Sequence, residues 1–330
     1  MMDCAESSNR NVQGTTYEAA SSKLSAIQLG YYHDPYMQYF VKRRERRSPL
    51  INRGYYSRVA AIRQYIEMFV KSLGNDELVQ VVNIGAGLDT MFFWIYEQYK
   101  NIKYYEMDFY ELLNEKKNII NNVELLNKFL ISNDKCVQNE KDLINCENYK
   151  MVSFDLNDAS SMEQKLTNSG FDFSLPTVFL CECVLIYLEV ESSDNLIKTL
   201  SELMKNTACI VVYEQVNPNT AFGAIMIDNF NQRGISLKSI YKYNSLELQM
   251  ERYKRLGWSN VYINDMNEIY DYHINSEEKK KIEKIEMFDE FEEWRLLQNH
   301  YFILVAFNCH KNIHPNKLKQ FLENKKTKGG

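Results

Sequence analysis

Hydrophobic residues along the chain alternate between short uninterrupted runs and longer amphipathic stretches. The runs are rich in β-branched residues, a pattern typical of strands that are buried on both faces of a sheet. The longer stretches place apolar residues three and four positions apart, which predicts helices. Strands that alternate with helices favour a parallel sheet with right-handed crossovers, and hence an α/β fold. The predicted strands lie at residues 79–84, 103–107, 150–154, 177–183, 208–213, 260–264 and 300–307.

The same pattern divides the chain into a core and several additions, which we interpret as a single domain. Small polar residues near the N-terminus predict an unstructured start. A stretch after the fifth strand interrupts the alternation and predicts inserted helices that cover the site. Long helices are predicted at residues 55–73 and 109–129. The predicted segments are an unstructured start at 1–22, a helical lid at 23–76, the core at 77–217 and 245–308, an insertion at 218–244 and a loose tail at 309–330.

Residues 78–108 have the most informative pattern in the chain. A buried strand runs into Gly85-Ala86-Gly87, a helix follows, and the next strand ends at Asp108. Glycines let a backbone turn sharply and approach a ligand closely, although a simple tight turn would contain them too. An acid about 20 residues beyond the glycines suits the hydroxyls of a ribose. The third glycine of the dinucleotide fingerprint and a phosphate-loop lysine are both missing, which disfavours NAD and ATP and favours S-adenosylmethionine.

Acidic residues stand at several predicted strand ends. In an open parallel sheet, ligands bind beyond the carboxyl ends of the strands, so these side chains are candidate ligand contacts. Asp155 is followed by Leu156, which pairs an acceptor for an adenine amine with an apolar surface for its ring. Asp108, Glu182 and Glu214 complete the set of acids expected at the site.

The sequence does not indicate a metal site or a nucleophile motif. Cys181 and Cys183 flank Glu182, and strand alternation predicts that their side chains lie on the opposite face as small core residues. The five histidines are scattered, and zinc-type spacing of ligands is missing. We therefore predict that the protein binds no metal.

Composition limits the possible partners. The chain has 330 residues, 45% of them hydrophobic, and a formal net charge of −5, which disfavours nucleic acid as a partner. Neither a signal-like N-terminus nor an apolar run of 18 residues is present, so we expect a cytoplasmic protein that does not contact membranes. We also expect a monomer.

Five motifs, in order along the chain, resemble those of the leucine carboxyl methyltransferases. The resemblance covers roughly residues 23–307 and implies a Rossmann-like class I methyltransferase fold. That fold has a seven-stranded sheet whose last strand is antiparallel, with a helical lid. The motifs are HDPY at residues 33–36, INRGYYSRV at 51–59, NIGAGLDT at 83–90, ECVLIY at 182–187 and YEQVNPNTAFGAIMIDN at 213–229.

The resemblance also implies a function. The family transfers a methyl group from S-adenosylmethionine to the α-carboxylate of the C-terminal leucine of the protein phosphatase 2A catalytic subunit. The expected partner is therefore that subunit, bound through its C-terminal tail and part of its folded surface. A tRNA-modifying carboxyl methyltransferase relative and a non-catalytic S-adenosylmethionine-binding regulator of the phosphatase are the alternatives. A dehydrogenase is disfavoured by the missing third glycine.

Residue roles follow from the matched motifs. Lys23 and Arg58 would hold the methionine carboxylate of the cofactor, and Asp108 would bind its ribose. Asp155 and Leu156 would contact the adenine. The whole cofactor-binding set implied by the resemblance is Lys23, Arg58, Gly85, Asp108, Asp155, Leu156 and Glu182.

Arg58 and Tyr187 are the implied catalytic residues, which would orient the incoming leucine carboxylate. A carboxylate is already ionised at neutral pH, so it can act as the nucleophile without a general base. The reaction then depends on placement and on the exclusion of water. Arginine suits this role because its planar guanidinium binds a carboxylate through two hydrogen bonds.

Overall fold

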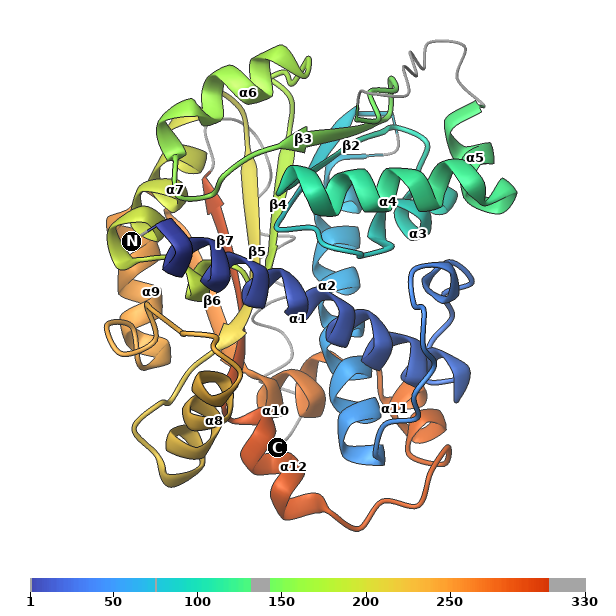
Figure 1. Cartoon of the computed structure of the whole chain (residues 1–330), viewed down its shortest axis with the longest axis vertical. Helices are drawn as coiled ribbons and strands as arrows, with labels where there is room; N and C mark the ends of the chain where they lie inside the picture. The colour runs from blue at the N-terminus through green and yellow to red at the C-terminus, as the bar shows by residue number, and fades with distance from the viewer. Residues whose placement is uncertain (1, 75, 132–142, 309–330) are drawn as a thin grey trace.

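A seven-stranded sheet forms the centre of the molecule (Figure 1). The computed structural model describes residues 2–74, 76–131 and 143–308, with side chains for 10–74, 76–130 and 143–308. The predicted tail at 309–330 lies outside these residues. The strands are β1 (Val79–Ile84), β2 (Ile102–Asp108), β3 (Tyr149–Ser153), β4 (Thr177–Glu182), β5 (Ala208–Gln215), β6 (Asn260–Asp265) and β7 (Tyr301–Asn308).

The strand order is β3-β2-β1-β4-β5-β7-β6. The neighbouring pairs among β1 to β5 are parallel, whereas β7 runs antiparallel to both β5 and β6. This arrangement confirms the predicted class I methyltransferase fold with its antiparallel last strand. Parallel strands place their carboxyl ends at one edge of the sheet, and the order reverses between β1 and β4, where ligands bind in such folds.

The sheet is covered on both faces, which explains the unbroken apolar runs of the strands. In β1, Val79 and Val81 belong to one hydrophobic cluster, and Val82 and Ile84 belong to the other. The first face packs against α2 (Pro49–Leu73), α3 (Met91–Gln98), α4 (Tyr110–Asn122) and α5 (Glu124–Ile131). The second packs against α6 (Met162–Asn168), α7 (Val190–Leu203) and α9 (Leu246–Arg255).

Two predicted helix boundaries are wrong for local reasons. The helix expected at 55–73 begins earlier, because Ser48 and Pro49 form its N-cap and first position. Proline is favoured at the start of a helix, where its missing N–H is not needed. The helix expected at 109–129 is two helices, since Val123 is extended between α4 and α5.

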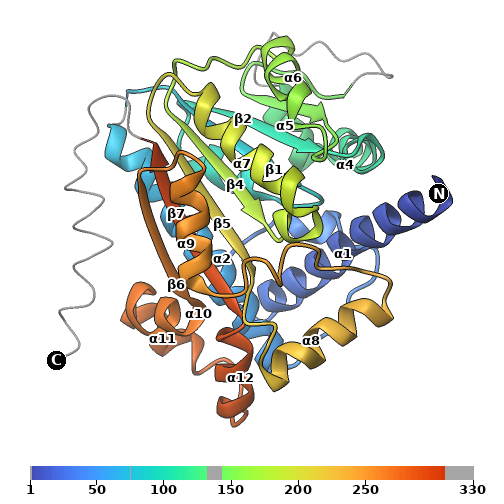
Figure 2. The same ribbon diagram turned by 90° about the vertical axis from the view of Figure 1, so that its left-hand side faces the viewer.

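The N-terminal segment is helical, which corrects the prediction of an unstructured start at 1–22. Helix α1 (Met2–Gln28) spans 27 residues and lies across the carboxyl ends of the parallel strands (Figures 1 and 2). Its second half buries Ala20, Leu24 and Ala26 in the core. The part before Ala20 is held by polar contacts to distant segments, such as the hydrogen bond that Leu88 N–H donates to Thr16 Oγ1. Such long-range contacts leave no periodic signal in a polar sequence.

The remaining helices are the insertion after β5 and a set of short elements. The predicted insertion contains α8 (Ala221–Gln232), which lies beside α1 in Figure 2. Between β6 and β7, short helices pack near α2 and β7. Within the described residues, no helix has the length and apolarity needed to cross a membrane. The short elements are η1 (Met37–Tyr39), η2 (Ala159–Ser161), η3 (Leu185–Tyr187), α10 (Met266–Glu268), the π-helical turn η4 (Ile269–His273), α11 (Ser276–Ile282) and α12 (Phe291–Gln298).

A buried ion pair joins β2 to α4 beneath the glycine turn. Lys116 Nζ lies 2.7 Å from Glu106 Oε2, and both side chains are almost fully buried. The same ammonium donates a 2.5 Å hydrogen bond to the carbonyl of Asp89. Burial raises the pKa of the Glu106 carboxyl, and the lysine opposes that shift by favouring the charged form. The pair thus links the core to the loop that follows the glycines.

Breaking this pair should destabilise the fold strongly. We expect Lys116→Met to lower the free energy of unfolding by about 3–5 kcal/mol, because it leaves Glu106 as an unpaired buried acid. Adding Glu106→Gln to that variant should recover part of the loss. Urea denaturation followed by circular dichroism measures both, with the exposed Lys198→Met as control. A loss below about 1 kcal/mol in the single variant would show that the pair is unimportant.

Candidate functional site

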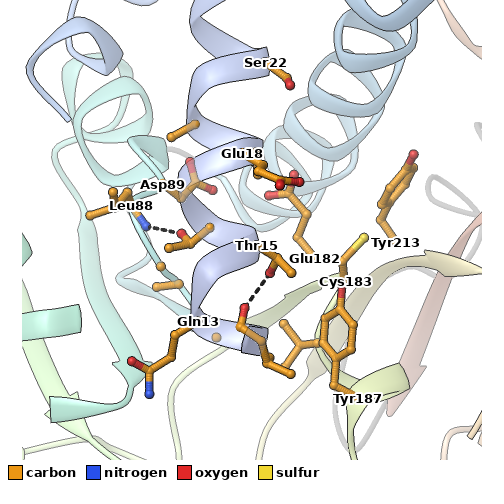
Figure 3. A pocket seen from close by; sticks show the side chains of 18 of the residues that line it. Gln13, Thr15, Glu18, Ser22, Leu88, Asp89, Glu182, Cys183, Tyr187 and Tyr213 are labelled. Atoms are coloured by element: carbon orange, nitrogen blue, oxygen red, sulfur yellow. Dashed lines mark hydrogen bonds between the residues drawn. The ribbon is translucent and has the colours of Figure 1, made fainter. Parts of the chain in front are cut away.

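A cavity of about 520 Å³ opens at the carboxyl ends of the parallel strands. Its volume lies within the usual range of small-molecule sites. All eight residues implied by the family resemblance line it: Lys23, Arg58, Gly85, Asp108, Asp155, Leu156, Glu182 and Tyr187. Figure 3 shows α1 passing over the cavity with Thr15, Glu18 and Ser22, while Glu182 and Cys183 lie at the end of β4 and Tyr187 lies in η3.

The glycine turn is closely packed. Gly85 has a φ of +67°, a conformation that side chains disfavour, and a Cβ at this position would lie 2.5 Å from Val184 Cγ2. Gly87 has a φ of +48°, and its Cβ would collide with Thr16 Oγ1. The two glycines therefore let α1 and the segment after β4 approach the turn from either side.

Asp108 ties the glycine turn to the end of β2. Its carboxylate accepts hydrogen bonds from Gly87 N–H and Phe109 N–H, each 2.7 Å long. Burial raises its pKa, and the two backbone donors counteract that effect. Asp155 is exposed at the end of β3, and Leu156 beside it is buried. The acceptor and the apolar surface predicted for an adenine thus lie side by side.

Glu182 at the end of β4 is the charged centre of the cavity. Lys23 Nζ of α1 lies 3.0 Å from its Oε2, and Arg58 Nε of α2 lies 2.5 Å from its Oε1. Their positive charges lower the pKa of Glu182 to about 2, against the opposing effect of burial. Lys23 also lies 3.7 Å from Asp89. Three elements far apart in the sequence therefore meet at one carboxylate.

The Arg58 guanidinium is surrounded by aromatic rings. Its Cζ lies 5.2 Å from the ring centre of Tyr55 and 4.7 Å from that of Tyr213, within the range of cation–π attraction. Within the described part of the chain, its Nη groups have no hydrogen-bond partner, because the contact with Glu182 uses Nε. Tyr187 lines the same region, and burial raises its pKa well above the usual value. The site thus offers a guanidinium edge and a neutral phenol to a ligand.

Two sequence expectations at the strand ends are wrong. Glu214 does not line the cavity; it is buried and its Oε1 accepts hydrogen bonds from Val184 N–H and Ile186 N–H. Strand alternation places its neighbours Tyr213 and Gln215 at the cavity instead. Cys183 does line the cavity, because its φ of +55° breaks the alternation directly after β4.

Several lining residues were not predicted. Asp89 could have been found from the sequence, since it belongs to the glycine motif. In the structure it lies within ion-pair distance of Lys23. Tyr55, Tyr213 and Tyr301 come from α2, β5 and β7. In a chain with 23 tyrosines, nothing local distinguishes these three.

Comparisons with known proteins define the family. The family model described as leucine carboxyl methyltransferase matches residues 11–201, which is more than half of the chain. The chain is 37% identical to the leucine carboxyl methyltransferase 1 homolog of Arabidopsis thaliana, over 92% of this chain and 91% of that protein. The chain belongs to the leucine carboxyl methyltransferase family.

Two further matches are to a longer protein and to a solved structure. The chain is 34% identical to the human tRNA wybutosine-synthesizing protein 4, over 89% of this chain but 44% of that protein. Among solved structures, a DUF574-family protein of Streptomyces avermitilis has a TM-score of 0.51 at 11% identity. It covers 78% of this chain, and 85% of its own length is matched. That structural likeness shows the shared fold alone.

The cavity of this methyltransferase fits its cofactor, S-adenosylmethionine, which supplies a sulfonium-bound methyl group. Lys23 and Arg58 are cations for a carboxylate. Asp89 and Glu182, which line the same cavity, are carboxylates for an ammonium. Among the residues that the structure describes, no cluster of three or more acids, histidines and cysteines could hold a metal. The donor set therefore suits an amino acid and a nucleoside.

Asp108 offers a direct test of cofactor binding. We expect Asp108→Ala to weaken binding of S-adenosylhomocysteine by roughly 1.5–3 kcal/mol, the usual contribution of hydrogen bonds to a charged group. Asp108→Asn should lose less, because its amide oxygen still accepts from the glycine turn. Isothermal titration calorimetry measures both affinities, and an unchanged affinity for Asp108→Ala would exclude the ribose role.

The ion cluster at Glu182 predicts a pH-dependent contribution to stability. Its folded pKa of about 2 lies below the ordinary value of 4.5, so the group stabilises the fold above pH 4.5. That contribution should shrink as the pH falls from 4.5 towards 2. We expect the difference in unfolding free energy between the wild type and Glu182→Gln to decrease from pH 5 to pH 3.5. The exposed Glu163→Gln is the control, and a pH-independent difference would contradict the assignment.

Proposed function

We propose that this methyltransferase esterifies the α-carboxylate of the C-terminal leucine of the protein phosphatase 2A catalytic subunit. The observation that carries the proposal is the Arg58 guanidinium, which lines the cavity and whose Nη groups have no hydrogen-bond partner among the described residues. A carboxylate binds such an edge through two parallel hydrogen bonds. Membership of the leucine carboxyl methyltransferase family supports this acceptor.

The side chains support a mechanism without a general base. A terminal carboxyl has an ordinary pKa of about 3.3–3.7, and a nearby arginine lowers it further. The acceptor is therefore ionised at neutral pH, and no side chain has to remove a proton from it; bound S-adenosylmethionine would supply the methyl group and leave as S-adenosylhomocysteine. Arg58 and Tyr187 would orient its two oxygens, and α1 would exclude water from above.

A tRNA substrate is the second candidate, because the human wybutosine-synthesizing protein is also 34% identical. The net charge of −5 gives the chain no overall attraction to a polyanion. The match to the Arabidopsis leucine carboxyl methyltransferase homolog extends over nine-tenths of both sequences. The match to the human tRNA wybutosine-synthesizing protein covers less than half of that protein. These observations favour the phosphatase tail.

The proposal is tested by incubating the protein and S-adenosylmethionine with phosphatase 2A catalytic subunit. Mass spectrometry of the C-terminal peptide should show one added methyl ester, which mild base removes. A subunit that lacks its terminal leucine is the matched control and should stay unmodified. Methylation of bulk tRNA with no methylation of the phosphatase would replace the proposed substrate by the second candidate.

Arg58 should not be replaceable by lysine. We expect Arg58→Lys to lower kcat/KM for the phosphatase by about 30-fold or more, equivalent to about 2 kcal/mol, because an ammonium lacks the paired donors. The exposed Arg46→Lys should retain full activity. Single-turnover methylation at saturating cofactor separates the chemical step from binding, and near-normal turnover of Arg58→Lys would disprove the role.

A further inference from the structure

The segment at residues 183–187, here the 183–187 turn, contacts several parts of the cavity. Val184 packs so closely on Gly85 that a Cβ there would collide with it. Cys183 and Tyr187 line the cavity itself. Ile186 packs in a separate hydrophobic cluster with residues of α8. The position of this one turn therefore affects the glycine turn, the predicted catalytic tyrosine and the inserted helix together.

The backbone of the turn is strained. Cys183 has a φ of +55°, which residues other than glycine rarely adopt. Such a conformation persists where the surrounding structure holds it. The Cys183 N–H donates to the Tyr213 carbonyl at 2.8 Å, which anchors the first residue of the turn to β5.

Glu214 holds the middle of the turn from below. It is 1% exposed on β5, and its Oε1 accepts hydrogen bonds from Ile186 N–H at 2.9 Å and Val184 N–H at 3.3 Å. Because it faces away from the cavity, it takes no part in the cofactor or acceptor contacts described above. Its carboxyl instead satisfies two backbone donors that the strained turn leaves without a helical or strand partner.

Among the described residues, no cation forms an ion pair with Glu214. Arg252 of α9 attracts it, but that guanidinium binds Asp194 at 2.7 Å and the Ser193 hydroxyl. Burial raises the pKa of Glu214 to about 7, and the arginine and the backbone donors oppose the shift. The other titratable groups near it are Cys181 of β4, Cys183 and Tyr187 of the turn, and Tyr253 of α9.

We propose that Glu214 is a positioning residue whose ionised carboxylate fixes the 183–187 turn, so that loss of its proton raises the rate of methyl transfer. The inference rests on the proposed function, because it acts through Tyr187. Hydrogen bonds to an ionised acceptor are roughly twice as strong as those to a neutral one. The ionised form therefore holds Val184 and Ile186 more firmly, and with them Gly85 and Tyr187.

A pH profile tests the effect on catalysis. At saturating S-adenosylmethionine, kcat of the wild type should rise by up to about tenfold from pH 6 to pH 8, since a group with a pKa near 7 changes from about 10% to about 90% ionised. The acceptor carboxylate is ionised throughout, so it adds no slope. Glu214→Gln keeps an acceptor oxygen but cannot titrate, and its profile should be flat at a low value. The exposed Glu202→Gln should retain the wild-type profile.

Hydrogen exchange tests the turn independently of activity. Corrected for the intrinsic pH dependence, the peptide that contains residues 184–186 should be better protected at pH 8 than at pH 6 in the wild type. In Glu214→Gln the protection should not depend on pH. Either of two results in Glu214→Gln would overturn the proposal. One is a pH profile of kcat like that of the wild type, and the other is protection that depends on pH as it does in the wild type. Suppose that hydrogen exchange depends on pH as expected but the protein does not methylate the phosphatase. That result would support the role of Glu214 in the turn and would reject the proposed substrate instead.

Discussion

The buried carboxylate of Glu182 is the interaction on which the site depends. It draws Lys23 of α1 and Arg58 of α2 to the end of β4, across sequence separations of 159 and 124 residues. An unpaired charge at this depth would be very costly, so the three side chains constrain one another. Helix α1, helix α2 and the sheet are thereby placed in a single arrangement around the cavity.

Charge balance in this cluster also restricts what the cavity accepts. Lys23 and Arg58 carry two positive charges, and Glu182 and Asp89 carry two negative ones, so the cluster is neutral as a whole. The amino-acid group of S-adenosylmethionine is a zwitterion, so the sulfonium is the one charge of the cofactor that this cluster does not need to balance. A group that carries both an ammonium and a carboxylate exchanges partners with the cluster without changing its total charge. The cluster therefore suits the zwitterionic amino-acid group of the cofactor.

The sequence was sufficient for the sheet and for the eight cavity residues that the matched motifs imply. Strand runs, the glycine turn and Asp108 are encoded locally, because each depends on its own neighbours along the chain. Glu214 was misassigned because strand-end acids were counted without regard to which face each one occupies. Its neighbours Tyr213 and Gln215 face the cavity, so alternation along β5 already places Glu214 on the other side. Cys183 escapes the same rule because its positive φ is a property of the folded turn.

Helix α1 shows why the start of the chain could not be predicted. Its second half is anchored by apolar burial and by the Ser25–Asn52 hydrogen bond in the core. The part before Ala20 is attached by polar contacts, among them Asn11 with the Gly234 carbonyl and Glu18 with Arg233, both exposed. Exposed contacts of this kind contribute at most about 1 kcal/mol each. The part of α1 before Ala20 is therefore held less strongly than the part that follows it. A polar sequence that folds through such weak distant contacts has the same local composition as one that does not fold at all.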